Sequence, residues 1–215
     1  MVVGELKEFM VRKKISPEKA HGSFFGFPSQ APSQYHLFRF GGHNPEPSAS
    51  PMNTLISGIR SAQRALKGEW KNRARDVAFS LTISTDFFLE IARLRAFRKL
   101  WARVLEFKRL PSTPLFIHAD SQCWNNQSLE PHSNMLKSTT AAMAAILGGC
   151  DVLTVSEADP NQPMMSRVAR NVSNILREES HFSNVADPIA GSFFLEDLTN
   201  QLTESAWKQL QKELV

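Results

Sequence analysis

Val77-Ala78-Phe79-Ser80-Leu81-Thr82-Ile83 alternates large apolar side chains with smaller ones, which is the pattern of a β-strand. Asp86 follows three residues later and can cap a helix that begins there. That helix carries apolar residues spaced so that they share one side, namely Phe87, Ile91, Leu94, Trp101 and Leu105. A strand that leads directly into an amphipathic helix predicts the repeating unit of a parallel α/β fold.

The same alternation of strand and helix continues toward the C-terminus. Short apolar strands are expected at 115–118 and 151–155, and helices at 134–147, 163–180 and 192–213. Gly148-Gly149 is typical of the end of a helix. About three strands are recognisable, whereas a closed (β/α)₈ barrel needs eight and roughly 250 residues. The fold class that we predict is therefore α/β, a partial (β/α)₈ TIM-type barrel of about three βα units with an irregular N-terminal segment.

The N-terminal third has a different composition. Residues 1–20 predict a short helix, while 21–53 hold many prolines, glycines and serines without clear periodicity. We therefore expect three parts: a short helix at 1–20, an irregular Pro/Gly/Ser-rich linker at 21–75 that leads into a basic segment, and a partial barrel at 76–215. In this arrangement Phe79, Leu81 and Phe116 would lie on the sheet face that needs a cover.

Bulk composition limits the function classes. The chain has 215 residues, 42% of them hydrophobic, and a net charge of +4. No apolar run is long enough to span a bilayer, and no secretory signal is recognisable. Cys123 and Cys150 are far apart, which suggests a reducing, cytoplasmic setting without a metal framework. Many basic residues fall in one predicted helix; nucleic-acid phosphate is one possible partner, but we interpret them as a solvated face balanced by a partner subunit.

Three segments of the C-terminal third carry a family resemblance. They are Ala169-Arg170-Asn171, Glu178-Glu179-Ser180 and the run from Ala186-Asp187-Pro188 through Gly191-Ser192 to Glu196. Together they resemble the methylmalonyl-CoA mutase family, whose members show A-R-N, then E-E-S, then D-P-x-x-G-S-[YF]-[YFM]-x-E. The resemblance covers about residues 75–210 and implies the C-terminal part of the substrate barrel of cobalamin-dependent isomerases.

The same family suggests a substrate site. The segment from Ile117-His118-Ala119-Asp120 to Trp124 resembles A-H-x-Q-T-S-x-W, in which the histidine contacts the thioester carbonyl of the substrate. The resemblance thus implies His118 as a vestigial catalytic contact, and His118, Asp120 and Trp124 as residues that bind acyl-CoA. At the end of a barrel strand a polar residue faces the active site. The alternative is that His118 is a structural hydrogen-bonding residue.

Departures from the family pattern point to one of its branches. Where catalytic members show H-T-N-S-x-D-E-A, this chain has Thr154-Val155-Ser156, and Asp120 replaces the family glutamine. No D-x-H-x-x-G, the motif whose histidine ligates cobalt, occurs in the chain. With these differences, the chain resembles the small, non-catalytic subunit of heterodimeric mutases. The differences imply that adenosylcobalamin is bound by a partner subunit and that this chain holds no metal.

The expected partner is a catalytic large mutase subunit, with self-association as the alternative. A membrane is not expected as a partner, and nucleic acid is not favoured. A second function, of a different class, is a structural or interaction protein derived from a half-barrel and without enzymatic activity.

Overall fold

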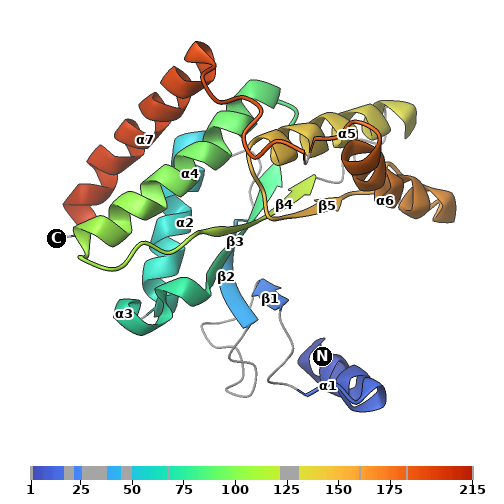
Figure 1. Ribbon diagram of the computed structural model, residues 1–215, viewed down its shortest axis with the longest axis horizontal. Helices are drawn as coiled ribbons and strands as arrows, with labels where there is room; N and C mark the ends of the chain where they lie inside the picture. The colour runs from blue at the N-terminus through green and yellow to red at the C-terminus, as the bar shows by residue number, and fades with distance from the viewer. Residues whose placement is uncertain are drawn as a thin grey trace.

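A computed structural model describes residues 2–16, 22–25, 38–44, 50–66, 68–121, 131–159, 161–182 and 184–214 (Figure 1). Its strands are β1 (Gly22–Phe25), β2 (Phe38–Asn44), β3 (Val77–Ile83), β4 (Phe116–Ser121) and β5 (Val152–Val155). The helices are α1 (Val2–Lys13), α2 (Pro51–Leu66), α3 (Trp70–Arg73), α4 (Phe87–Phe107), α5 (Pro131–Leu147), α6 (Pro163–Glu178) and α7 (Phe193–Leu214), with a 3₁₀ turn η2 (Ala74–Asp76) before β3. None of the described helices is long and apolar enough to cross a membrane.

The five strands form one sheet in which every neighbouring pair is parallel. Their order in space, β1-β2-β3-β4-β5, is their order along the chain. A doubly wound sheet reverses its direction at a switch point, but an α/β barrel adds each strand on the same side of the previous one. This mixed α/β architecture is therefore consistent with part of an α/β barrel.

The N-terminal region differs from what we expected. The range 21–75, predicted to be an irregular linker, contains β1, β2 and the long helix α2. β2 includes Gly41 and Gly42, which remove the side-chain alternation that marks a strand in sequence. Its parallel pairing with the buried strand β3, from Phe40↔Val77 to Asn44↔Leu81, stabilises it instead. The expectation of only three strands therefore undercounted the sheet.

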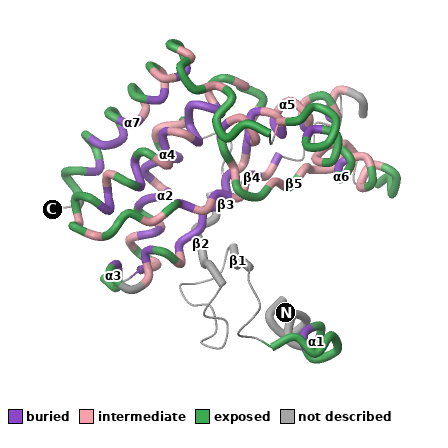
Figure 2. Tube along the Cα trace, in the orientation of Figure 1, coloured by how far each residue is buried: buried purple, intermediate pink, exposed green. Residues whose placement is uncertain are grey.

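One face of the sheet packs against the helices. Phe79 of β3 lies edge-on to Phe97 and Trp101 of α4, with ring centroids 4.6 and 5.9 Å apart. Leu81, like Phe79, belongs to the buried core, and β3 is buried along most of its length (Figure 2). The expectation that Phe79 and Leu81 face away from the helices is thus wrong, because the alternation of β3 turns its larger side chains toward α4. Phe116 does lie on the opposite face, in register with Ala78.

Helix α4 is held by ion pairs as well as by its apolar side. Its cations, expected to form a solvated face, contact carboxylates within the chain: Arg93–Glu90, Arg95–Asp187, Arg95–Glu196, Arg98–Asp151, Lys99–Glu196 and Arg103–Glu204. Arg98 also donates to the backbone carbonyl of Leu115 at 2.6 Å. These cations therefore fasten α4 to β4, β5 and α7, and they offer little unpaired charge for nucleic-acid phosphates.

Candidate functional site

The sheet face opposite α4 carries small and polar side chains. We call it the polar face and define it by alternate residues of three strands: Ala78, Ser80 and Thr82 of β3, Phe116, His118 and Asp120 of β4, and Val152 and Thr154 of β5. Successive side chains of a strand point to opposite faces, and registered neighbours in parallel strands share a face. The polar face is therefore fixed by the same alternation that buries Phe79 and Leu81.

His118 occupies the centre of the polar face. Its Nδ1 lies 2.8 Å from Ser80 Oγ on β3, and its Nε2 lies 2.8 Å from Thr154 Oγ1 on β5. Ser80 is only 3% exposed, His118 is half-buried and Thr154 is exposed. The imidazole thus spans three strands and is oriented from both of its nitrogens, so that it cannot rotate without losing a hydrogen bond.

The structure places the other predicted residues as follows. Asp120 follows His118 on the polar face, where its Oδ1 accepts a hydrogen bond from Ser156 Oγ at 3.3 Å. His118 was expected at the end of its strand, but β4 continues to Ser121, so His118 lies in the middle. Trp124 lies outside the described residues. The structure therefore brings His118 and Asp120 to one face.

A buried ion pair borders the carboxyl end of β3. Glu90 Oε2 accepts from Arg93 Nε at 2.8 Å, and Arg93 donates to the backbone carbonyl of Thr82 at 2.6 Å. Glu90 Oε1 accepts from both the backbone N–H and the hydroxyl of Ser84, at 3.1 and 2.7 Å. Ligands of parallel α/β folds bind at the carboxyl ends of the strands. The pair therefore fixes the loop that follows β3 at the end of the sheet where a ligand is expected.

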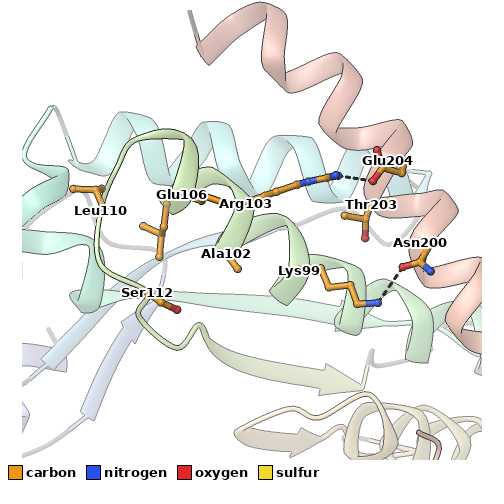
Figure 3. A pocket seen from close by; sticks show the side chains of 10 residues that line it. Lys99, Ala102, Arg103, Glu106, Leu110, Ser112, Asn200, Thr203 and Glu204 are labelled. Atoms are coloured by element: carbon orange, nitrogen blue, oxygen red, sulfur yellow. Dashed lines mark hydrogen bonds and ion pairs between the residues drawn. The ribbon is translucent and has the colours of Figure 1, made fainter. Parts of the chain in front are cut away.

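No metal centre accompanies His118 in the described part of the chain. Its His, Cys, Asp and Glu side chains form no group of three that could hold a metal ion. A groove of about 630 Å³ lies between α4 and α7, far from the polar face, and Arg103 and Lys99 in its wall contact Glu204 and Asn200 (Figure 3). Because these cations are already paired, the groove is a poor candidate for binding an anion.

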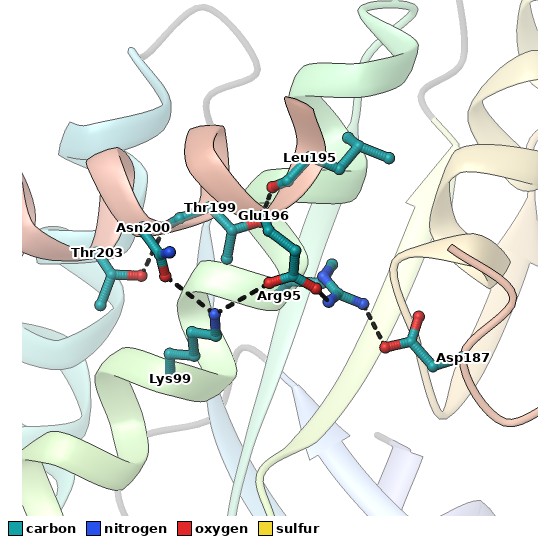
Figure 4. Close-up of polar contacts among 8 residues, drawn as sticks. All are labelled: Arg95, Lys99, Asp187, Leu195, Glu196, Thr199, Asn200 and Thr203. Atoms are coloured by element: carbon teal, nitrogen blue, oxygen red, sulfur yellow. Dashed lines mark hydrogen bonds and ion pairs between the residues drawn. The ribbon is translucent and has the colours of Figure 1, made fainter. Parts of the chain in front are cut away.

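The D-P-x-x-G-S segment has a structural role. Arg95 binds Asp187 Oδ2 at 2.5 Å and also contacts Glu196, while Lys99 joins Glu196 to Asn200 (Figure 4). Gly191 has a φ of +82°, a conformation that favours glycine, just before α7 begins. The two acidic residues of the motif therefore dock the turn and α7 onto α4.

Sequence reasoning missed two members of the site. Ser80 was seen only as part of an apolar strand, and Thr154 only as a replacement for a family residue. The alternation of β3 does place Ser80 opposite Phe79, but nothing local in the sequence indicates that it meets His118. That contact depends on the register Ser80↔His118, which joins residues from separate strands.

Comparison with known proteins identifies related chains. Residues 41–213 match the family described as Methylmalonyl-CoA mutase. The methylmalonyl-CoA mutase small subunit of Porphyromonas gingivalis is 36% identical over 63% of this chain and 23% of its own length. That of Streptomyces virginiae is 40% identical over 60% of this chain and 22% of its own. A probable mitochondrial methylmalonyl-CoA mutase of Caenorhabditis elegans is 31% identical over 94% of this chain and 30% of its own. The chain thus spans less than a third of the length of these relatives.

Proposed function

Because this chain belongs to the methylmalonyl-CoA mutase family, we propose that it forms part of the TIM-type substrate barrel of a cobalamin-dependent mutase and is non-catalytic by itself. The whole enzyme would interconvert methylmalonyl-CoA and succinyl-CoA. This chain would act as a small subunit or a shortened form of one, beside a catalytic large subunit. The names of the relatives from Porphyromonas gingivalis and Streptomyces virginiae support the small-subunit assignment.

The observation that carries this proposal is the polar face. Barrel interiors are usually filled by bulky branched side chains such as Val, Ile and Leu. Here the hydroxyl residues Ser80 and Thr154 flank His118 instead, and Thr82 lies on the same face beside Asp120. Small polar side chains leave room for an elongated ligand with several hydrogen-bonding groups, and the pantetheine arm and thioester of an acyl-CoA have this chemistry. His118 and Asp120 would bind that ligand, together with Trp124.

The residues present do not fit cobalt ligation. Thr154 and Ser156 stand where catalytic members carry His and Asn. The sequence has no D-x-H-x-x-G. We therefore assign adenosylcobalamin, which would supply the radical chemistry, to the partner subunit.

Two titrations test the proposal. The purified 215-residue chain is titrated with adenosylcobalamin, and binding is followed by absorbance. A second titration uses acyl-CoA and is followed by calorimetry. We expect acyl-CoA to bind and cobalamin to show no histidine-ligated spectrum. Micromolar cobalamin binding with such a spectrum would contradict the non-catalytic assignment. Co-purification from the source cells should in addition recover a catalytic large mutase subunit.

One surface favours a second function, that of an interaction protein without enzymatic activity. Phe88, Phe193 and Phe194 are 53%, 88% and 60% exposed, and the rings of Phe88 and Phe194 are 5.9 Å apart. Clustered exposed aromatic side chains are typical of protein interfaces. Under this function, co-purification would recover a protein other than a mutase subunit, and a Phe88→Ser, Phe194→Ser double variant would lose it.

A further inference from the structure

The hydrogen bonds of His118 define which group of the site can meet a ligand. Both ring nitrogens already have hydroxyl partners, Ser80 on one side and Thr154 on the other. A neutral imidazole donates from one nitrogen and accepts at the other, whereas a hydroxyl can donate and accept at once. The direction of the two hydrogen bonds therefore decides whether Ser80 or Thr154 keeps a hydroxyl hydrogen for another partner.

The burial of Ser80 favours one direction of its hydrogen bond with His118. Ser80 is only 3% exposed, and His118 is the only hydrogen-bond partner of its side chain in the described part of the chain. If Nδ1–H donated to Ser80, the Ser80 hydroxyl hydrogen would be buried without an acceptor, which is costly. If Ser80 donates to Nδ1 instead, its hydroxyl hydrogen is satisfied. The proton of the neutral ring then resides on Nε2 and is donated to Thr154 Oγ1.

We propose that Thr154 is the residue that donates to the ligand at this site, oriented by Ser80 through His118; the ligand group is the carbonyl oxygen of an acyl thioester. This inference rests on the proposed function. With Nε2–H donating to its oxygen, Thr154 keeps its own O–H free, and its exposed position on β5 turns that donor toward any molecule on the polar face. For the carbonyl oxygen of the ligand, Thr154 makes the contact, and His118 contributes to binding by positioning Thr154.

The carboxylate of Asp120 limits which chemical group of a ligand Thr154 can bind. Asp120 is the registered neighbour of Thr154 on β4 and lies on the same face. A carboxylate there repels a second carboxylate and leaves a neutral carbonyl as the favoured acceptor. Thr154 would therefore distinguish the thioester carbonyl of an acyl-CoA from a free acid group.

Two CoA compounds that differ only at the carbonyl test this contact. Propionyl-CoA carries a thioester carbonyl, and propyl-CoA, the thioether, has a methylene in its place. We expect the 215-residue chain to bind propionyl-CoA about three- to tenfold more tightly than propyl-CoA, which is the effect of one hydrogen bond. Thr154→Val, which keeps the branched shape but lacks the hydroxyl, should abolish this preference, and Thr154→Ser should retain it. In parallel, ¹⁵N NMR of His118 should show the Nε2–H tautomer. Ser80→Ala should reduce the population of this tautomer.

The outcomes separate the two proposals. If propionyl-CoA and propyl-CoA bind the wild-type chain equally, or if Thr154→Val keeps the preference, acyl-CoA binding stands and the role of Thr154 is wrong. If neither compound binds, the proposed function fails and Thr154 has no acyl ligand to contact. An Nδ1–H tautomer of His118 in the free chain would overturn the hydrogen-bond direction in either case.

Discussion

The position of Cys150, three residues after the end of α5, determines the pKa of its thiol. Burial and the adjacent Asp151 carboxylate raise the pKa of its thiol from 9.0 to about 12. A thiol reacts as its thiolate, so at pH 8 we expect alkylation of folded Cys150 to be about a thousandfold slower than in denaturant. The Cys123→Ala variant isolates this signal, and mass spectrometry follows the labelling. Rapid alkylation of the folded chain at pH 8 would contradict the raised pKa.

The same shift has a consequence for stability. Because the folded-state pKa of Cys150 lies above the unfolded value, the unfolded chain loses its proton first as pH rises. The contribution of the protonated thiol is complete well below pH 9.0 and declines as pH rises from there toward about 12. Urea unfolding from pH 8 to 10.5 should show a steeper loss of stability for Cys123→Ala than for a variant that also carries Cys150→Ala.

The Glu90–Arg93 pair predicts a large effect from one substitution. Both side chains are buried, with 7% and 6% of their surface exposed. Glu90→Ala should lower the free energy of unfolding by about 3–5 kcal/mol, because it leaves Arg93 charged and buried without its carboxylate. Glu178→Ala, in the exposed pair with Arg177, is the matched control and should change it by less than about 1 kcal/mol. If urea unfolding showed the same loss of stability for Glu90→Ala and Glu178→Ala, the buried pair would not be important for stability.

At the scale of elements, the close packing of α2 on α4 depends on Gly58. A Cβ at this position would lie 2.6 Å from the ring of Phe97, which is fully buried. Gly58→Ala should therefore cost about 1–3 kcal/mol of overpacking, offset by about 1 kcal/mol of helix propensity. In a Phe97→Leu background the same change should become neutral or stabilising, because the clashing ring atoms are gone. Additive effects of the two substitutions would argue against this contact.

A second element-scale prediction concerns the docking of α7. Arg95 joins α4 to Asp187 and Glu196 at once (Figure 4). Lysine cannot bind two carboxylates in this forked geometry. Arg95→Lys should therefore accelerate limited proteolysis between residues 181 and 192, whereas Arg177→Lys should leave the cleavage pattern unchanged. Cleavage at the wild-type rate in Arg95→Lys would show that packing alone holds the turn.

At the scale of the whole molecule, we predict association. Parallel sheets are normally covered on both faces, yet Val152 on the polar face is 45% exposed and β5 is an edge strand of the described sheet. Size-exclusion chromatography with light scattering should therefore find the purified chain in an assembly, alone or with a large mutase subunit. A cooperatively melting monomer of 24.2 kDa would contradict this expectation.

The elements differ in how far they could be predicted. β3, α4, α5, α6 and α7 were expected within a few residues of their bounds, because each has a strong apolar period of its own. β1 and β2 lack that signal and depend on pairing with β3. Asp86 does precede α4, but its side chain makes no capping bond, and Ser84 Oγ accepts its N–H instead. The division into parts at 1–20, 21–75 and 76–215 stays a prediction, but its middle part contains β1, β2 and α2 and is not an irregular linker throughout.

The sequence by itself determined the period of each C-terminal helix and strand and the motifs that mark the family, because these are local properties of the chain. Only the tertiary structure decided which cation of α4 meets which carboxylate and that Ser80 and Thr154 flank His118. Apart from Arg93–Glu90, these contacts join residues 36 to 101 positions apart, such as His118 with Thr154 and Arg95 with Glu196. They depend on strand register and helix docking, and a slip of one residue in β4 would turn His118 to the helix side.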